Sequence, residues 1–149
     1  MSFVIREGTL EELLSIDLLL PEFEQKSSKE NLAQRLKNRK SLLLIACEND
    51  KPIAYKLGYE LSSKEFYSWL GGVVPDYRKR GVATKLREAQ ESWAIENGYS
   101  SISVKSMNQF PAMLQLLIAS DYQITGYEDN GTLESSKIKF SKKLVNINE

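Results

Sequence analysis

The segment Trp69-Leu-Gly-Gly-Val-Val-Pro-Asp-Tyr-Arg-Lys-Arg-Gly-Val-Ala-Thr-Lys-Leu86 joins the end of an apolar strand pattern to the start of a helical pattern. Pro75 ends the strand, and the helix begins at Gly81. The first backbone N–H groups of a helix have no partner inside it, and the helix dipole makes that end electropositive. Because anions bind at such an end when small side chains let them approach, the segment predicts an anion site.

Small and basic residues gather at this helix start. Gly81, Ala83 and Thr84 leave the backbone accessible. Positions 76 to 90 hold five basic and two acidic residues, which are Arg78, Lys79, Arg80, Lys85, Arg87, Asp76 and Glu88. The alternative interpretation is that the basic side chains are merely solvated and that the glycine only makes a turn. Bases at a helix N-terminus oppose the dipole, which favours a bound anion that compensates them.

The composition of the chain excludes several kinds of chemistry. Its 149 residues include 20 basic and 20 acidic side chains, no histidine and one cysteine. Zero formal charge argues against binding nucleic acid or a membrane through overall basicity. Without histidine there is no Ser-His or Cys-His pair, and no imidazole base or metal ligand. One cysteine makes neither an intramolecular disulfide nor a thiolate zinc cluster, so we expect no metal and a buried thiol at Cys47.

The sequence shows no targeting pattern. The first twelve residues contain acidic side chains where a signal peptide needs an apolar core. The longest wholly apolar run, Leu42 to Cys47, is far shorter than the roughly 20 residues of a membrane span. We therefore expect a cytoplasmic protein without a membrane partner.

Hydrophobic periodicity predicts one α/β domain over residues 1–149, with elements in the order β-α-α-β-β-β-α-β-α-β-β. Capping-box spacings at Thr9–Glu12 and Ser27–Glu30 open the first two helices. The fourth helix, 111–120, is apolar almost all round and is expected to be buried. A tight turn at Asn130-Gly131 is expected to join the last two strands, 122–128 and 133–140.

The central segment resembles a known family. Arg78-Lys-Arg-Gly81-Val-Ala83 matches [QR]-x-x-G-x-[GA], the signature of the GNAT N-acetyltransferase superfamily. The preceding Val73-Val-Pro75-Asp-Tyr-Arg78 is similar to the end of that family's fourth strand. Asn108 and the helix leading to Tyr122 are similar to the family's later N…G-[FY] segment. The resemblance implies a GNAT-like fold, a mixed central sheet of six to seven strands flanked by about four helices.

The resemblance also implies acetyl-CoA as cosubstrate. Family members hold the pyrophosphate with backbone amides of the signature loop, and the end of the preceding strand binds the pantetheine arm. A splay between that strand and the next admits the cofactor. The cofactor-binding residues implied here are Val73, Val74, Arg78, Lys79, Arg80, Gly81, Val82, Ala83, Thr84 and Asn108.

The catalytic residues are less determined than the cofactor loop. Because histidine is absent, a carboxylate acting through water is the candidate base, and Glu60 at the end of an alternating strand is our choice. The alternative for Glu60 is an exposed strand-end carboxylate. Tyr67, which shares a face with Trp69, is the candidate for the acceptor pocket, with core packing as its alternative. Leu117 stands where many family members place a tyrosine acid, and Asp121 replaces the usual glycine.

These observations favour an acetyl-CoA-dependent N-acetyltransferase that transfers an acetyl group directly to a primary amine of a small molecule or peptide. A non-catalytic acyl-CoA-binding module remains the alternative, because no acid or base is clearly defined. Binding to nucleic acid is disfavoured because the basic patch is small. The charges between positions 21 and 40 are too balanced to select an acceptor, and the sequence leaves open whether the chain forms a homodimer.

Overall fold

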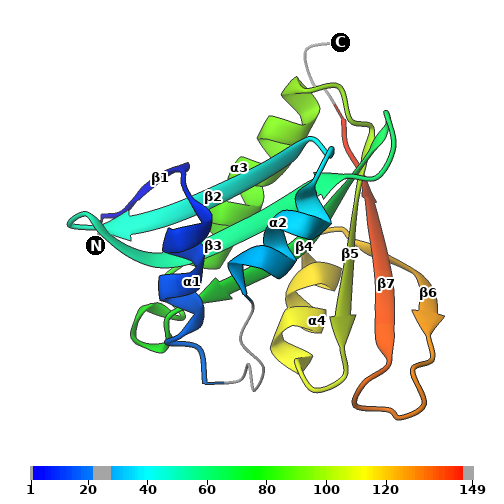
Figure 1. Cartoon of the computed structure of the whole chain (residues 1–149). Helices are drawn as coiled ribbons and strands as arrows, with labels where there is room; N and C mark the ends of the chain where they lie inside the picture. Colours follow the sequence, from blue (N-terminus) through cyan, green and yellow to red (C-terminus); the bar gives the residue numbers. More distant parts are fainter. Residues whose placement is uncertain (1, 22–27, 146–149) are drawn as a thin grey trace. The chain divides into compact units, whose positions relative to one another are not determined.

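The computed structural model describes residues 2–21 and 28–145 (Figure 1). Seven strands form one mixed sheet in the order β1-β2-β3-β4-β5-β7-β6, accompanied in the described residues by four α-helices and one 3-10 helix. The predicted fold class and element order are confirmed, and the 3-10 helix is an addition. The elements are β1 (Val4–Glu7), α1 (Leu10–Asp17), α2 (Lys29–Leu36), β2 (Ser41–Glu48), β3 (Lys51–Glu60), β4 (Glu65–Val73), η1 (Pro75–Tyr77), α3 (Val82–Glu96), β5 (Ser101–Met107), α4 (Pro111–Ala119), β6 (Gln123–Glu128) and β7 (Lys137–Lys143).

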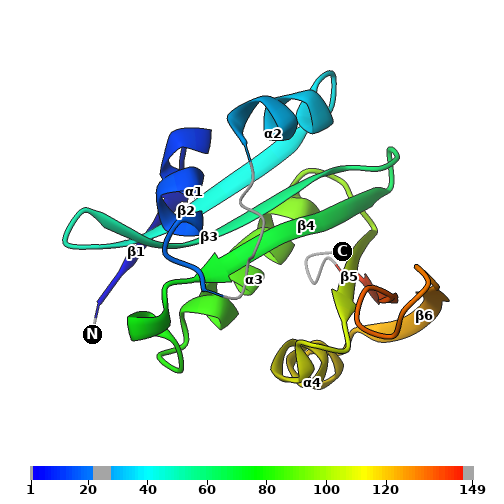
Figure 2. The ribbon, with the colours of Figure 1, turned by 60° about the horizontal axis from the view of Figure 1, so that its bottom comes forward.

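The chain divides into two compact units, and the expectation of a single domain stays a prediction. The first unit covers 1–60 and 69–93. In it, β1 pairs antiparallel with β2, and β2 pairs antiparallel with β3. Figure 2 shows α1 and α2 on one side of β2 and β3, with α3 on the other. One core lies under α1 and α2, and its buried members are Leu13, Ile16, Leu20, Leu32, Ile45, Cys47, Tyr55, Leu57 and Val74. The predicted burial of the Cys47 thiol is confirmed.

The first two helices begin at side-chain caps. The predicted capping box at α1 is present, since the N–H of Glu12 donates to Thr9 Oγ1 at 3.2 Å and the N–H of Thr9 donates to Glu12 Oε1 at 3.0 Å. Arg6 also donates to the Glu12 carboxylate, which lowers the pKa of Glu12 to about 2. The cap of α2 is Ser28, whose hydroxyl accepts from the N–H of Asn31, and the predicted cap Ser27 lies outside the described residues.

Gly8, between β1 and α1, is required by a close approach. A Cβ placed there would lie 2.2 Å from Cγ1 of Ile45, a residue that is 0 % exposed. Gly8→Ala is therefore expected to lower the free energy of unfolding by about 2 kcal/mol, because the core must shift to admit the methyl group. Urea unfolding measures this loss. Gly126→Ala is the matched control, because its Cβ would meet Lys139 Cδ at an ordinary 3.4 Å, and an equal loss in both variants would contradict the prediction.

The second unit covers 61–68 and 94–149. In it, the N-terminal part of β4, Glu65–Ser68, pairs parallel with Ser101–Val104 of β5. Strand β7 pairs antiparallel with both β5 and β6. The expectation that α4 is buried all round is wrong. Leu117 is its one buried residue, whereas Ile118 is 57 % exposed. An apolar sequence does not set how many faces of a helix are covered, and α4 buries a single narrow stripe.

The tight turn expected at Asn130-Gly131 is also wrong, because β7 begins at Lys137 and a loop of residues 129–136 replaces the turn. Hydroxyl and carboxylate side chains hold this loop together. Asp129 Oδ1 accepts from the N–H of Gly131 at 2.9 Å, and Ser136 Oγ accepts from the N–H of Asn130 at 3.0 Å. Local side-chain bonds of this kind compete with the strand ladder, which explains why pairing starts later than the Asn-Gly step suggests.

Candidate functional site

The loop that follows β4 is hydrogen-bonded to both β3 and β4. The N–H of Val74 donates to the carbonyl of Ile53 at 2.9 Å, and the carbonyl of Val74 accepts from the N–H of Tyr77 at 2.9 Å. Arg78 folds back, and its Nε donates to the carbonyl of Val73 at 2.9 Å. Arg78 therefore holds the loop against the strand end, and each bonded carbonyl of Val73 and Val74 keeps one further lone pair for a ligand.

The start of α3 has the geometry of an anion site. Lys79 and Gly81 adopt φ angles of 62° and 81°, in the left-handed region that favours glycine. The N–H of Lys85 donates to the carbonyl of Gly81 at 3.1 Å, so the N–H groups of residues 82–84 precede the first intrahelical bond. A Cβ on Gly81 would meet nothing within 4 Å, and the first turn of α3 contains no acidic residue. The start of α3 thus combines backbone donors that no intrahelical bond uses, open space beside Gly81 and a positive helix end that no acidic residue of the first turn compensates.

The five basic side chains predicted to gather here have different roles. Lys79 and Arg80 are exposed, and the Arg80 guanidinium lies 5.5 Å from the ring centroid of Tyr77. Arg87 instead forms an ion pair with Glu91 in the same helix, at 2.9 Å. The local positive excess is therefore concentrated in the loop before the helix and not along α3.

The candidate catalytic residue Glu60 lies apart from this loop, and the candidate Tyr67 belongs to the second unit. Glu60 ends β3 where the hairpin to β4 closes, and the N–H of Leu61 donates to the carbonyl of Glu65 at 2.9 Å. Glu60 is seven positions after Ile53 on β3, which is roughly 23 Å of strand. Tyr67 is 9 % exposed and faces Ser103 in the β4–β5 ladder of the second unit. Their proposed roles remain predictions.

Strand β4 changes face in the first unit. Trp69 and Leu70 both pack on the core beneath α1 and α2, whereas a Cβ on Gly71 would point at Lys56 on the opposite face. A Cβ on Gly72 would point back at Leu20 of the core. Since side chains alternate strictly along a regular strand, this pattern indicates a bulge between Trp69 and Gly71.

Comparison with known proteins decides the family. Residues 9–117 match the family described as Acetyltransferase (GNAT) family. The chain belongs to the GNAT acetyltransferase family. It is therefore an acyltransferase by family, and the resemblance seen around Gly81 is confirmed. No curated protein matches the sequence significantly.

Solved structures of GNAT proteins share the fold at low sequence identity. The ribosomal-protein-S18-alanine N-acetyltransferase of Escherichia coli is 15 % identical with a TM-score of 0.84, over 99 % of both chains. Ard1 of Thermoplasma volcanium is 14 % identical with a TM-score of 0.84, over 98 % of this chain and 100 % of its own. A GNAT acetyltransferase of Elizabethkingia anophelis with acetyl-CoA bound is 18 % identical with a TM-score of 0.75, over 95 % and 98 %.

Other parts of the GNAT chain add observations on the site. Asn108 is exposed, and its Nδ2 donates to the carbonyl of Leu133 at 3.3 Å within the second unit, so its expected contact with the cofactor stays a prediction. Leu117 is 4 % exposed, and α4 contains no tyrosine. Asp121 has a φ of 72°, a left-handed conformation that suits the glycine that the family usually has at this position.

The described residues include no group of three metal-ligating side chains, and none of the described helices could span a bilayer.

Two polar features of the GNAT chain were missed by sequence reasoning. Lys56 shares a face of β3 with Ala54 and Gly58, and burial lowers its pKa to about 8. Nearby on α3, Gln90 is 0 % exposed, and neither atom of its amide has a partner among the described residues. On α3, Gln90 and Ala94 are buried, whereas Ala89 and Trp93 are only partly buried.

The second missed feature is the basic end of α2. Arg35 and Arg39 lie against the aromatic rings of Trp69 and Tyr59. The only sequence pattern that could have indicated this basic site is the composition of residues 31–47, which contain four basic and no acidic side chains. Nothing in that pattern reveals which strand the arginines contact.

Proposed function

We propose that the chain is an acetyl-CoA-dependent N-acetyltransferase that transfers an acetyl group directly to a primary amine of a small molecule or peptide. One observation supports the cosubstrate above the others. The N–H groups of residues 82–84 have no partner inside the helix, a Cβ on Gly81 would enter open space, and the helix end has basic neighbours and no acidic residue in its first turn. A pyrophosphate has the charge and the acceptor oxygens that this arrangement requires.

The cofactor roles follow from the loop. The backbone of residues 79–84 holds the pyrophosphate, with Lys79 and Arg80 supplying charge. Arg78 acts mainly on the loop itself, because its Nε is bonded to the carbonyl of Val73. The free lone pairs of the Val73 and Val74 carbonyls accept hydrogen bonds from the amides of the pantetheine arm, which runs back along β4 towards Trp69.

Acetyl-CoA supplies a thioester, whose thiol is a good enough leaving group to depart without a dedicated acid. The protein supplies the other requirements. A backbone N–H in the last part of β4, between Trp69 and Val73, stabilises the oxyanion. Glu60 removes the proton of the amine through water, from the closed end of the β3–β4 hairpin. No histidine is available for that step in this sequence, and Leu117 provides no proton.

A thermal-shift measurement tests the cosubstrate. At 1 mM, acetyl-CoA with a micromolar dissociation constant is expected to raise the Tm by about 5 °C or more, whereas a short oligonucleotide leaves it unchanged. No shift with acetyl-CoA would sink the proposal. Release of free thiol in the presence of amines, but not in their absence, then separates an enzyme from an acyl-CoA-binding module without chemistry.

A further inference from the structure

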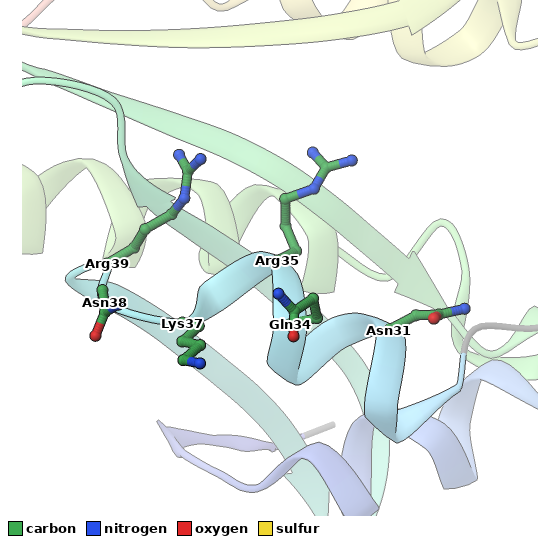
Figure 3. A pocket seen from close by; sticks show the side chains of 6 residues that line it. All are labelled: Asn31, Gln34, Arg35, Lys37, Asn38 and Arg39. Atoms are coloured by element: carbon green, nitrogen blue, oxygen red, sulfur yellow. The ribbon is translucent and has the colours of Figure 1, made fainter.

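The C-terminal end of α2 and the residues after it form a basic hollow of about 510 Å³ in the first unit (Figure 3). Three cations and three amides line it, and they are Asn31, Gln34, Arg35, Lys37, Asn38 and Arg39. The one carboxylate of α2, Glu30, is not among the lining residues. A chain with zero net charge thus has a single-sign patch at this place.

The guanidinium groups of two lining arginines lie against an aromatic floor, the rings of Tyr59 and Trp69, neither of which is among the residues that line the hollow. Arg35 NH1 donates to the hydroxyl of Tyr59 at 3.0 Å, and its guanidinium lies 4.8 Å from the ring centroid of Trp69. Arg39 lies 4.8 Å from the ring centroid of Tyr59, and the Tyr59 and Trp69 rings meet edge to face at 5.6 Å. Figure 3 shows Arg35 and Arg39 pointing to the same side of α2, away from Lys37 and Gln34.

The two guanidinium groups are better compensated by a bound anion than by water alone. A guanidinium has five N–H donors, and the donors that Arg35 does not give to the Tyr59 hydroxyl can match the two oxygens of a carboxylate or phosphate. Like charges held on one floor repel each other unless an anion lies between them. The negative end of the α2 dipole favours a cation at Arg35, which lies in the last turn. It does not account for the second cation, Arg39, because that residue lies beyond the helix end at Leu36.

The aromatic floor also lies where the acceptor is expected. Trp69 is at the bulge of β4, four residues or roughly 13 Å of strand before Val73. In the proposed function the pantetheine arm runs along these residues, so its reactive end approaches Trp69. A group bound by Arg35 and Arg39 is then held beside the reacting amine.

We propose that Arg35 and Arg39 bind an anionic group, a carboxylate or a phosphate, of the amine acceptor. The inference rests on the proposed function and gives it a substrate class, an amine that also has an acidic group. Tyr59 acts as a positioning residue, because its hydroxyl and its ring fix the two guanidinium groups.

Steady-state kinetics test the substrate class. The acceptors are glutamate for a carboxylate, O-phosphoethanolamine for a phosphate, and 1,5-diaminopentane for an amine without an anion. Arg35→Gln and Arg39→Gln are each expected to raise the KM of the preferred anionic acceptor by about tenfold to a hundredfold, and to leave the KM of acetyl-CoA unchanged. Lys37→Gln removes the same charge from the same hollow, but from the side chain that points away, and should change the KM less than twofold. Equal KM values in all variants, or preference for the diamine, would overturn the inference.

A binding experiment separates this inference from the proposed function. The chain has two tryptophans, so Trp93→Phe leaves Trp69 as the only indole reporter. Glutarate or inorganic phosphate is expected to change the Trp69 fluorescence with saturation, and Arg35→Gln in the same background should abolish that change. If no acceptor is acetylated but the change persists, the proposed function fails and the anion site stands. If neither probe changes the fluorescence, the anion site fails whatever the enzyme does.

Discussion

Replacing Gly81 with aspartate is expected to weaken the binding of acetyl-CoA by about a hundredfold or more. The φ of 81° strains any residue with a side chain, and the open space that a Cβ would enter is the space proposed for the pyrophosphate. The new carboxylate would also interact with the positive end of α3 in place of the phosphate and would repel it. Isothermal titration with acetyl-CoA measures the loss.

Gly98→Asp is the matched control. Gly98 has a φ of 87°, and a Cβ on it would also meet nothing within 4 Å, but it follows the opposite end of α3. Both variants are expected to lose similar stability, and only Gly81→Asp should lose affinity. Micromolar affinity retained by Gly81→Asp, or an equal loss of affinity in Gly98→Asp, would refute the phosphate loop.

Replacing Lys56 with methionine is expected to raise the free energy of unfolding by about 1 to 3 kcal/mol at pH 7, because the side chain is only partly buried. Burial lowers the pKa of Lys56 from 10.5 to about 8, and Arg87 adds to this effect while Glu91 opposes it. The folded state therefore holds the charged lysine at a cost, whereas the ion pair of Arg87 with Glu91 remains intact in the variant. Removing the charge removes that cost.

The pH dependence gives the sign of this effect. Below pH 8, Lys56 is protonated in both the folded and unfolded states, so the full cost is present. Between pH 8 and 10.5 the unfolded state binds more protons, and the stability contributed by this group rises with pH. Urea unfolding should therefore show a large gain for Lys56→Met at pH 7 and almost none above pH 10.5. Lys51→Met, an exposed position on the same strand, should show no such gain, and a pH-independent gain at Lys56 would contradict the prediction.

Local patterns in the sequence predicted the features that depend on neighbouring residues. The capping box of Thr9, the alternation of β3 and the turn into α3 at Gly81 each rest on a few adjacent positions. The arginine hollow depends instead on the contact of Arg35 with Trp69, 34 positions along the chain, and periodicity contains no information on such a contact. The same holds for the candidate catalytic residues, because Glu60 and Gly81 lie far apart and no local pattern links them.

The exposure of α4 shows the other limit of sequence reasoning. Hydrophobicity indicates which residues favour burial, but the number of covered faces depends on the neighbours that the fold supplies. Ile118 is apolar and exposed, while Gln90 is polar and wholly buried. Both observations follow from the position of a helix on the sheet and not from the composition of that helix.

The burial of the single cysteine has a consequence at the bench. Cys47 is 6 % exposed and belongs to the core beneath α1 and α2, so a thiol-reactive dye does not reach it while the chain is folded. Colour that develops in a coenzyme-release assay then comes from the product and not from the protein. In denaturant, the same dye titrates one thiol per chain, which makes Cys47 a built-in reporter of the opening of this core.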